Sequence, residues 1–375
     1  MREFDVAIVG AGIAGASLAY RLAQGARVVL LERESQPGYH ATGRSAAMFM
    51  ESYGPSGVRA LTRASRAFYE HPPQGFADAP VLAPRGVLYL ATHEQQSHLQ
   101  ELRDTLAGSG TPVEEVAAEQ ALARVPCLRP EVVRGALFDR DAQDVDVHAL
   151  HQGFLRGARR HGAELLVDAE LVTAQRTDDG WTLQPANGEA LRARTLVNAA
   201  GAWGDEVARL CKVAPVGLVP HRRSAFTFNA PDGVDTTHWP AVVGVDESYY
   251  FKPDAGRLLG SPANADPTVP HDVAPEELDI AMGIHQIESV TTMQIRRPAS
   301  TWAGLRSFVP DGELVIGWDD ACEGFFWLVA QGGYGIQSAA GASALAAALI
   351  RNDPLPDDLR RHGVVPQRFA VQRLR

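Results

Sequence analysis

The feature that most constrains the fold lies near the start of the chain, where a short apolar segment runs into a glycine-rich turn. Residues 6–9 read Val-Ala-Ile-Val, a run typical of a buried parallel strand. Gly10, Gly12 and Gly15 follow with the spacing G-x-G-x-x-G, and residues 16–24 have the character of a helix. In this motif the glycines permit a tight turn, a close approach of the backbone to a pyrophosphate and close packing of helix on strand. The segment therefore predicts a strand, turn and helix that bind a dinucleotide.

The next segment supports this interpretation and favours one class of dinucleotide. A second apolar strand is predicted over residues 27–31, and it ends at Glu32, 22 positions after Gly10. A carboxylate at that place accepts hydrogen bonds from the ribose hydroxyls of adenosine. The motif alone does not separate NAD from FAD, but the small, polar, glycine-containing loop of residues 33–47 suits a flavin. A glycine-rich turn without a ligand is the alternative, which the neighbouring strand, helix and acid disfavour.

Two later segments place small residues after a predicted strand. Residues 195–200 run into the turn of residues 198–201, and the strand of residues 325–330 runs into residues 331–335 and a final helix. Small residues there suit a strand that passes close beneath a dinucleotide, and a tight turn without a cofactor is the alternative. Because these units lie far from the first one in the sequence, they indicate one discontinuous nucleotide domain.

Composition excludes several other classes of protein. The formal charge of −10 and the pI near 5.6 argue against a general nucleic-acid binder. The three cysteines, Cys127, Cys211 and Cys322, are scattered and predict neither a metal site nor a disulfide framework. No apolar run approaches the roughly 18 residues that span a bilayer, and no signal peptide precedes the first strand. We therefore expect a soluble cytoplasmic protein without a metal.

Six blocks of sequence resemble one superfamily of flavoproteins, which includes D-amino-acid oxidase, glycine oxidase and sarcosine oxidase. The chain is more closely similar to the bacterial FAD-dependent D-arginine dehydrogenases, nearly from end to end. The blocks are residues 36–47, 197–203, 222–226, 259–267, 301–308 and 330–337.

The resemblance implies an α/β fold with two parts. One is a discontinuous Rossmann-like FAD-binding domain of the D-amino-acid oxidase type, expected over residues 1–80, 145–215 and 303–375. The other is a substrate-binding domain on a mixed, largely antiparallel sheet, expected over residues 81–144 and 216–302.

The resemblance also implies non-covalent FAD. The helix that starts near Gly335 would point its positive end at the flavin and stabilise charge that appears on reduction. The implied FAD-binding residues are Gly10, Gly12, Ile13, Ala14, Gly15, Glu32, Arg33, Thr42, Gly43, Arg44, Ser45, Ala46, Ala47, Val172, Ala200, Gly201, Trp203, Arg306, Gly333, Tyr334, Gly335, Ile336 and Gln337.

The reaction implied by the resemblance is oxidative deamination of a D-amino acid. Hydride transfer to flavin N5 would give a 2-imino acid, which water hydrolyses to a 2-oxo acid and ammonia. Arg222 and Arg306 would bind the carboxylate, a role that suits the planar, two-donor guanidinium. Tyr53 and Tyr249 would close over the substrate, and the carbonyl of Gly332 would accept from its amino group.

Alternatives remain open for these polar residues. By strand alternation only one of Arg222 and Arg223 faces the site, and a surface ion pair is the other interpretation of Arg222. Packing alone is the alternative for Tyr53 and Tyr249.

Departures from the D-arginine dehydrogenases bear on the substrate. Their glutamate, histidine and threonine in the pocket align with Val87, Met48 and Met50, and Gln337 completes the expected pocket. Losing a buried charge partner costs several kcal/mol, so the chain is expected to prefer hydrophobic or varied D-amino acids over D-arginine. Glu51 is a conceivable replacement anion.

Several rival functions are weighed against this one. A related flavoprotein acting on a secondary amine of the glycine or sarcosine type, or on a 2-hydroxy acid, would use the same carboxylate site. A nicotinamide-dependent dehydrogenase is disfavoured by the loop of residues 44–47, and a non-catalytic sensor by the two arginines. The electron acceptor, a quinone, a carrier or O2, is not identified by the sequence, and a monomer is favoured.

Overall fold

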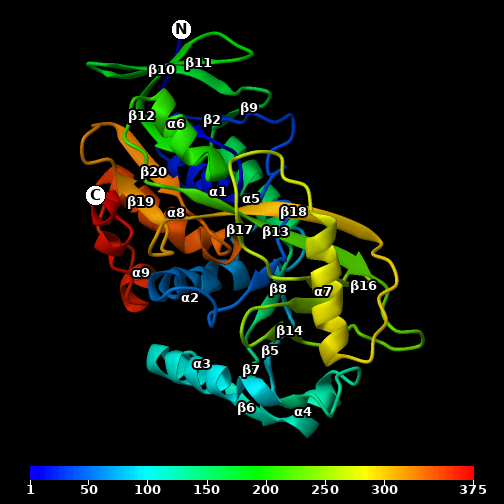
Figure 1. The fold of residues 1–375 in the computed structure, drawn as a ribbon. Helices are drawn as coiled ribbons and strands as arrows, with labels where there is room; N and C mark the ends of the chain where they lie inside the picture. The colour runs from blue at the N-terminus through cyan, green and yellow to red at the C-terminus, as the bar shows by residue number, and fades with distance from the viewer.

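The computed structural model describes residues 1–375, apart from the side chain of Ser109. Two large sheets, joined by a small three-stranded one, organise the chain (Figure 1). The small sheet has the order β3-β8-β4 and consists of β3 (Met48–Phe49), β8 (Gln143–Val145) and β4 (Leu82–Pro84).

The first large sheet has eight strands and contains the predicted parallel core. Its order is β10-β11-β12-β1-β2-β9, and β20 continues it by pairing with β12 and with β19. Strands β1, β2, β9, β12 and β20 pair in parallel, whereas β10, β11 and β19 join antiparallel. The strands are β1 (Arg2–Val9), β2 (Val28–Leu31), β9 (Glu164–Leu166), β10 (Leu171–Thr177), β11 (Gly180–Pro185), β12 (Leu191–Asn198), β19 (Val315–Trp318) and β20 (Phe325–Val329).

Both faces of this sheet are covered, which explains why its strands are apolar on both sides. Helices α1 (Ile13–Leu22), α2 (Ser56–Glu70), α5 (Val147–Arg160) and α8 (Gly335–Arg351) form one apolar core with it. Helix α6 (Gly204–Leu210) covers the other face and shares a second apolar core with strands of the sheet that include the β10–β11 hairpin. The carboxyl ends of β1 and β20 lead directly into α1 and into the turn before α8, so both predicted glycine turns lie at the same edge of the sheet (Figure 1).

The second large sheet has nine strands and is mixed but mainly antiparallel, as expected. Its order is β17-β13-β16-β15-β14-β5-β7-β6, and β18 pairs with β13. Only β14 and β5 pair in parallel. The strands are β5 (Val87–Thr92), β6 (Glu114–Ala117), β7 (Val133–Asp139), β13 (Val219–Phe228), β14 (Ala241–Gly244), β15 (Tyr250–Asp254), β16 (Arg257–Ser261), β17 (Asp266–Pro267) and β18 (Ser300–Phe308).

The two faces of the second sheet have different neighbours. Helices α4 (Ala118–Arg124) and α7 (Glu277–Val290) pack with the core on one face. Helix α3 (Gln96–Ser109) packs on the other face, and α9 (Asp357–Arg361) packs near α2. The proposed domain boundary at residues 302/303 falls inside β18, and the division into domains stays a prediction.

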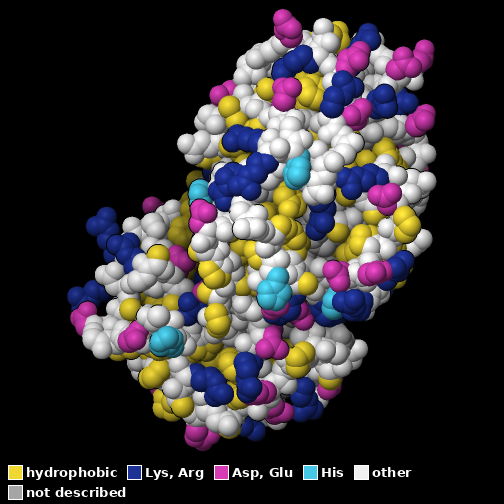
Figure 2. Space-filling model, turned by 180° about the vertical axis from the view of Figure 1, so that it is seen from behind, with side chains coloured by type: hydrophobic (Ala, Val, Ile, Leu, Met, Phe, Trp, Pro, Cys, Tyr) yellow, Lys and Arg dark blue, Asp and Glu magenta, His cyan; other side chains and the backbone are white. Residues whose placement is uncertain are grey.

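The surface carries charges of both signs. Figure 2 shows basic and acidic side chains interspersed over the rear face of the molecule. Among the described residues, no helix combines the length and the apolar character needed to cross a bilayer.

Candidate active site

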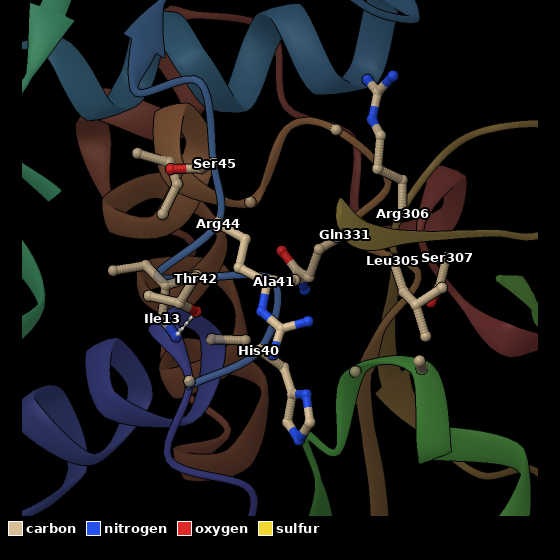
Figure 3. A pocket seen from close by; sticks show the side chains of 18 of the residues that line it. Ile13, His40, Ala41, Thr42, Arg44, Ser45, Leu305, Arg306, Ser307 and Gln331 are labelled. Carbon is tan, nitrogen blue, oxygen red and sulfur yellow. Dashed lines mark hydrogen bonds between the residues drawn. The ribbon is translucent and has the colours of Figure 1, made fainter. Parts of the chain in front are cut away.

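A cavity of about 500 Å³ lies between the two large sheets. The β1–α1 turn, the segment of residues 38–50 and the turn before α8 form one side, and strands β13, β14, β15 and β18 form the other. Figure 3 shows the segment that carries Thr42 and Arg44 opposite Leu305, Arg306 and Ser307 of β18. The cavity therefore joins the predicted nucleotide site to the face of the second sheet.

The glycine turn has the tight geometry that the motif predicts. Gly10 has φ of +98°, and a Cβ there would lie 2.5 Å from the carbonyl oxygen of Ala199. Glu32 is buried, and its carboxylate accepts from the backbone N–H of Ala11 at 2.8 Å and of Glu34 at 3.0 Å. Glu32 therefore fixes the conformation of the turn, and it also lines the cavity.

The segment of residues 38–47 is held by two residues near its middle. Thr42 Oγ1 accepts from the N–H of Ile13 at 3.0 Å, which ties the segment to the start of α1 (Figure 3). Arg44 donates to the carbonyls of Val273 at 3.1 Å and Ala303 at 3.2 Å, and it pairs with Asp272. The hydrogen bond from Arg44 holds the pKa of Asp272 below its usual range. The segment therefore bridges the two sheets.

The residues present fit FAD. Gln331 lines the cavity, and its amide nitrogen is buried without a hydrogen-bond partner among the described residues. Figure 3 shows its side chain between the segment of residues 40–45 and β18. An unpaired buried donor is costly, so a polar ligand in the cavity is the physical explanation for it. Its surroundings, a glycine turn, a buried acid and a helix N-terminus, are those of a dinucleotide site.

Most of the predicted FAD-binding residues line this cavity. They are Gly10, Gly12, Ile13, Ala14, Glu32, Arg33, Thr42, Arg44, Ser45, Ala46, Ala47, Ala200, Gly201, Trp203, Arg306, Gly333, Gly335, Ile336 and Gln337.

Four of the predicted FAD-binding residues lie outside the lining. Gly15 packs against the backbone of Gly10, which matches its expected role in helix packing. The N–H of Gly43 donates to the carbonyl of Gly38 at 2.8 Å. Val172 is 49% exposed, and Tyr334 caps α8 with its ring 5.2 Å from that of Tyr53.

Arg223 and Arg306 provide the cationic end of the cavity. Strand pairing places His221 opposite Arg306 and Arg223 opposite Gly304, so both guanidiniums leave the same face of the sheet. Arg306 donates to Tyr53 OH at 2.8 Å, and Arg223 donates to the carbonyl of Asn264 at 2.6 Å. Burial, followed by repulsion from Arg306, lowers the pKa of Arg223.

Neither guanidinium has an anionic partner. No described carboxylate lies within ion-pairing distance of Arg223 or Arg306. Two half-buried cations that lie together without a carboxylate favour the binding of an anion from outside the protein.

Three predicted site residues lie elsewhere, and the first is Arg222. It extends from the opposite face of β13, where it pairs with Asp266, Glu276 and Asp279. The expectation that Arg222 faces the cavity is therefore wrong, and Arg223 takes that position. The physical reason is strand alternation, because Arg222 is in phase with Phe226, which lies in the core beneath α7.

The other two corrections concern Tyr249 and Val87. Tyr249 is buried in the core on the α7 side, and its neighbour Tyr250 lines the cavity instead. Val87 is fully buried and lies outside the lining, whereas Tyr89, two residues further along the same face of β5, lines it. Both errors follow from the assignment of a side chain to the wrong place along a strand.

The remaining predicted substrate residues, Met48, Met50, Tyr53, Gly332 and Gln337, all line the cavity. Gly332 has φ of +52°, and its N–H donates to the carbonyl of Ser307 at 3.0 Å. Gln337 donates to the carbonyl of Tyr53 at 3.2 Å and so helps to hold the tyrosine.

Among the charged residues on this side of the cavity, Lys252 is already paired, whereas Glu247, an exposed residue that also lines the cavity, has no ion-pair partner among the described residues. Lys252 lines the cavity and donates to Asp144 at 2.6 Å, and Asp144 also accepts from Arg85 at 2.7 Å. Glu51, the conceivable anion of the sequence interpretation, accepts from Arg66 at 2.6 Å and lies outside the lining. Ala241 and Val243 of β14 add an apolar surface beside the methionines.

The sequence interpretation chose Arg222 over Arg223, and it missed Tyr250, Tyr89 and Gln331. The phase of the neighbouring apolar residues would have identified Arg223, Tyr250 and Tyr89, because large apolar residues occupy the α7 side of each strand. No sequence signal identifies Gln331, whose importance comes from its burial.

Comparison with known proteins agrees with this geometry. The family of FAD dependent oxidoreductases, DAO, matches residues 5–349. Glycine oxidase of Bacillus licheniformis is 26% identical over 328 residues, which cover 84% of the chain and 84% of that protein. Dimethylglycine dehydrogenase of Homo sapiens is 24% identical over 264 residues, 69% of this chain, and the chain spans 30% of that protein's length.

A solved structure confirms the fold. Glycine oxidase from Geobacillus kaustophilus is similar with a TM-score of 0.83, covering 97% of this chain and 99% of that one, at 23% identity. The predicted combination of an FAD-binding Rossmann-like part and a mixed substrate-binding sheet is thereby confirmed. From the family match and the fitting cavity together, this chain belongs to the DAO family of FAD dependent oxidoreductases.

Proposed function

We propose that this enzyme oxidises D-amino acids with neutral side chains to 2-imino acids, which water hydrolyses to 2-oxo acids and ammonia. The observation that carries the proposal is the pair of half-buried guanidiniums, Arg223 and Arg306, without a carboxylate partner, beside an apolar pocket. The D configuration rests on the resemblance to D-amino-acid oxidases and D-arginine dehydrogenases.

The residues of the chain would act mainly by orientation. Arg223 and Arg306 would bind the substrate carboxylate, and Tyr53, which accepts from Arg306, would fix one guanidinium. The carbonyl of Gly332 would accept from the amino group and direct the Cα–H bond. When bound, FAD supplies the acceptor for the hydride that leaves this carbon. If the amine binds in its neutral form, no general base is needed, and we assign none.

Charge at the apolar end supports neutral side chains. Lys252 and Arg85 share the single carboxylate of Asp144, so this group carries a net positive charge. A cationic side chain such as that of D-arginine would be repelled there and would find Glu51 occupied by Arg66, which leaves the exposed Glu247, in the turn between β14 and β15, as the unpaired carboxylate of the lining on this side. Met48 and Met50 offer a surface that suits an apolar side chain.

A second candidate is the oxidation of a secondary or tertiary amine that carries a carboxylate. The similarity to proteins named glycine oxidase and dimethylglycine dehydrogenase favours it. The same pair of guanidiniums would bind these substrates, so the carboxylate site does not separate the two candidates.

A substrate panel tests the proposal. FAD-loaded protein is mixed without oxygen with D- and L-amino acids, glycine, sarcosine, dimethylglycine and 2-hydroxy acids. Loss of absorbance at about 450 nm reports reduction of the flavin. We expect D-leucine, D-methionine or D-phenylalanine to bleach the flavin fastest. Bleaching by N-methyl glycines alone would favour the second candidate, and D-arginine as the best substrate would contradict the charge argument. Admission of air then distinguishes an oxidase from a dehydrogenase.

A further inference from the structure

Tyr89 lies at the end of the cavity that is remote from Arg223. Cavity-lining side chains come from β18, β13, β15, β14 and β5, in the order of the sheet. On the next strand, β7, Leu137 pairs with Tyr89, but it is fully buried and outside the lining. Four strand spacings, roughly 19 Å, separate β13 from β5. Tyr89 is thus the last side chain that a substrate extending along the sheet away from Arg223 would meet.

The hydroxyl of Tyr89 is anchored below the cavity. It lies 2.8 Å from Ser52 Oγ, and Ser52 donates to Asp139 Oδ2 at 2.6 Å. All three residues are buried, and burial raises the pKa of Tyr89 well above its usual value, so the phenol stays neutral. Ser52 directly precedes Tyr53, so Tyr89 is anchored to the same segment that carries Tyr53, the hydrogen-bond acceptor of Arg306.

The anchored ring separates the cavity from a buried carboxylate. Asp139 pairs with Val87 across β7 and β5, on the same face of the sheet as Tyr89. Its carboxylate accepts from Ser52 and from the N–H of Asp141 at 3.1 Å, and it does not line the cavity. Removing the ring would both lengthen the cavity and open a path towards this anion.

We propose that Tyr89, fixed by Ser52 and Asp139, is the specificity-determining residue that limits the length of the substrate side chain. The inference rests on the proposed amino-acid oxidation and deepens it. The ring forms the end of the pocket, and its packing in the apolar cluster on this face holds it in place even without the hydrogen bond to Ser52. Linear side chains that extend past the ring are excluded, and short to medium apolar ones are accepted.

The test compares kcat/KM along a series of linear D-amino acids, from D-alanine through D-norvaline and D-norleucine to D-2-aminooctanoate, with D-lysine and D-arginine added. For the wild-type protein we expect kcat/KM to rise and then fall as the side chain lengthens. In Tyr89→Val the optimum should move to a longer side chain, with about a tenfold or larger gain in the ratio of long to short substrates. D-Lysine and D-arginine should gain as well, because Asp139 becomes reachable.

Two control variants separate the ring from other effects. Tyr89→Phe keeps the ring and should keep the wild-type length optimum. Leu90→Val lies on the same strand but in the core beneath α7, so it should leave the length profile unchanged. FAD content and the melting temperature of each variant report folding independently of activity.

The outcomes distinguish this inference from the proposed function. If the wild-type protein oxidises D-amino acids and Tyr89→Val keeps the same length optimum, the inference is wrong and the function stands. If Tyr89→Phe shifts the optimum as far as Tyr89→Val does, the hydroxyl rather than the ring sets specificity and the inference is also wrong. If no D-amino acid reduces the flavin in any variant, the proposed function fails first.

Discussion

Arg223 and Arg306 are cations that folding partly buries without an anionic partner. Such an arrangement opposes folding, since desolvation of an unpaired charge is costly. Arg222, one residue away, has three carboxylates around it and a part in holding α7 to the sheet. We therefore expect Arg223 to favour substrate binding at a cost in stability, and Arg222 to favour stability without a part in substrate binding.

Arg223→Met should raise KM for the substrate by about 30-fold or more, because a buried charge partner of a carboxylate contributes several kcal/mol. Its melting temperature should stay equal or increase. Arg222→Met is the matched control, and it should leave KM within about twofold while lowering the melting temperature. Steady-state kinetics and thermal unfolding measure both effects, and a large KM change in Arg222→Met alone would reverse our assignment.

Gln331 has a buried amide nitrogen that finds no partner in the protein. Gln331→Leu should therefore stabilise the FAD-free protein, because it removes an unsatisfied donor worth about 1–3 kcal/mol. The same change should weaken FAD binding by about tenfold, since the donor to the ligand is lost. Thermal unfolding of the FAD-free form and fluorescence titration with FAD give the two results. Tighter FAD binding in the variant would show that the amide does not contact the cofactor.

Among the structural elements, the β1–α1 turn depends on a positive φ at Gly10, a conformation that glycine adopts without strain. Gly10→Ala adds a Cβ at φ of +98°, 2.5 Å from the carbonyl of Ala199. The two strand ends must separate, so we expect purified Gly10→Ala to contain little or no FAD. Gly25→Ala is the control, because a Cβ at Gly25 has no atom within 4 Å. Absorbance spectra of the purified proteins measure FAD content, and a normally loaded Gly10→Ala would contradict the close packing.

Local motifs and long-range strand phase differ in how well they could be predicted. The turn of residues 10–15 and the acid at Glu32 were predictable, because their geometry is encoded within one short segment. The choice between Arg222 and Arg223 depends on which face of β13 meets α7, a contact between segments far apart in the chain. The structure of residues 114–124 was equally hard to predict. Their composition is typical of a helix throughout, but the first four residues form strand β6, which pairs with β7. Tertiary pairing overrides local propensity in both cases.

At the scale of the whole molecule, His151 connects acidity to the cofactor site. It is buried on α5 and its Nε2 lies 2.8 Å from the carbonyl oxygen of Ala11, inside the glycine turn. Burial lowers its pKa below 6.5, with a smaller contribution from His148. The unfolded chain therefore binds more protons than the folded one just below pH 6.5, so stability rises with pH through that window and is lost as the pH falls.

His151→Gln removes this titration and keeps a side-chain N–H for the carbonyl of Ala11. The free energy of unfolding of the wild-type protein should fall relative to that of the variant as the pH is lowered from about 7.5 to 5. Denaturant unfolding at several pH values measures the difference. A difference that is constant with pH would show that His151 titrates normally in the folded protein.

The contact between Arg306 and Gly333 makes the two ends of the cavity interdependent. A Cβ at Gly333 would overlap the guanidinium of Arg306, so the arginine lies directly on the turn before α8. We expect a ligand that immobilises Arg306 to immobilise that turn as well and so to strengthen FAD binding, and by thermodynamic reciprocity FAD would strengthen the binding of that ligand by the same factor. A simple 2-oxo acid should therefore slow the dissociation of FAD, as measured by the return of free-flavin fluorescence after dilution. The product of the reaction would then help to retain the cofactor. The enzyme would lose its FAD most readily once both substrate and product are depleted.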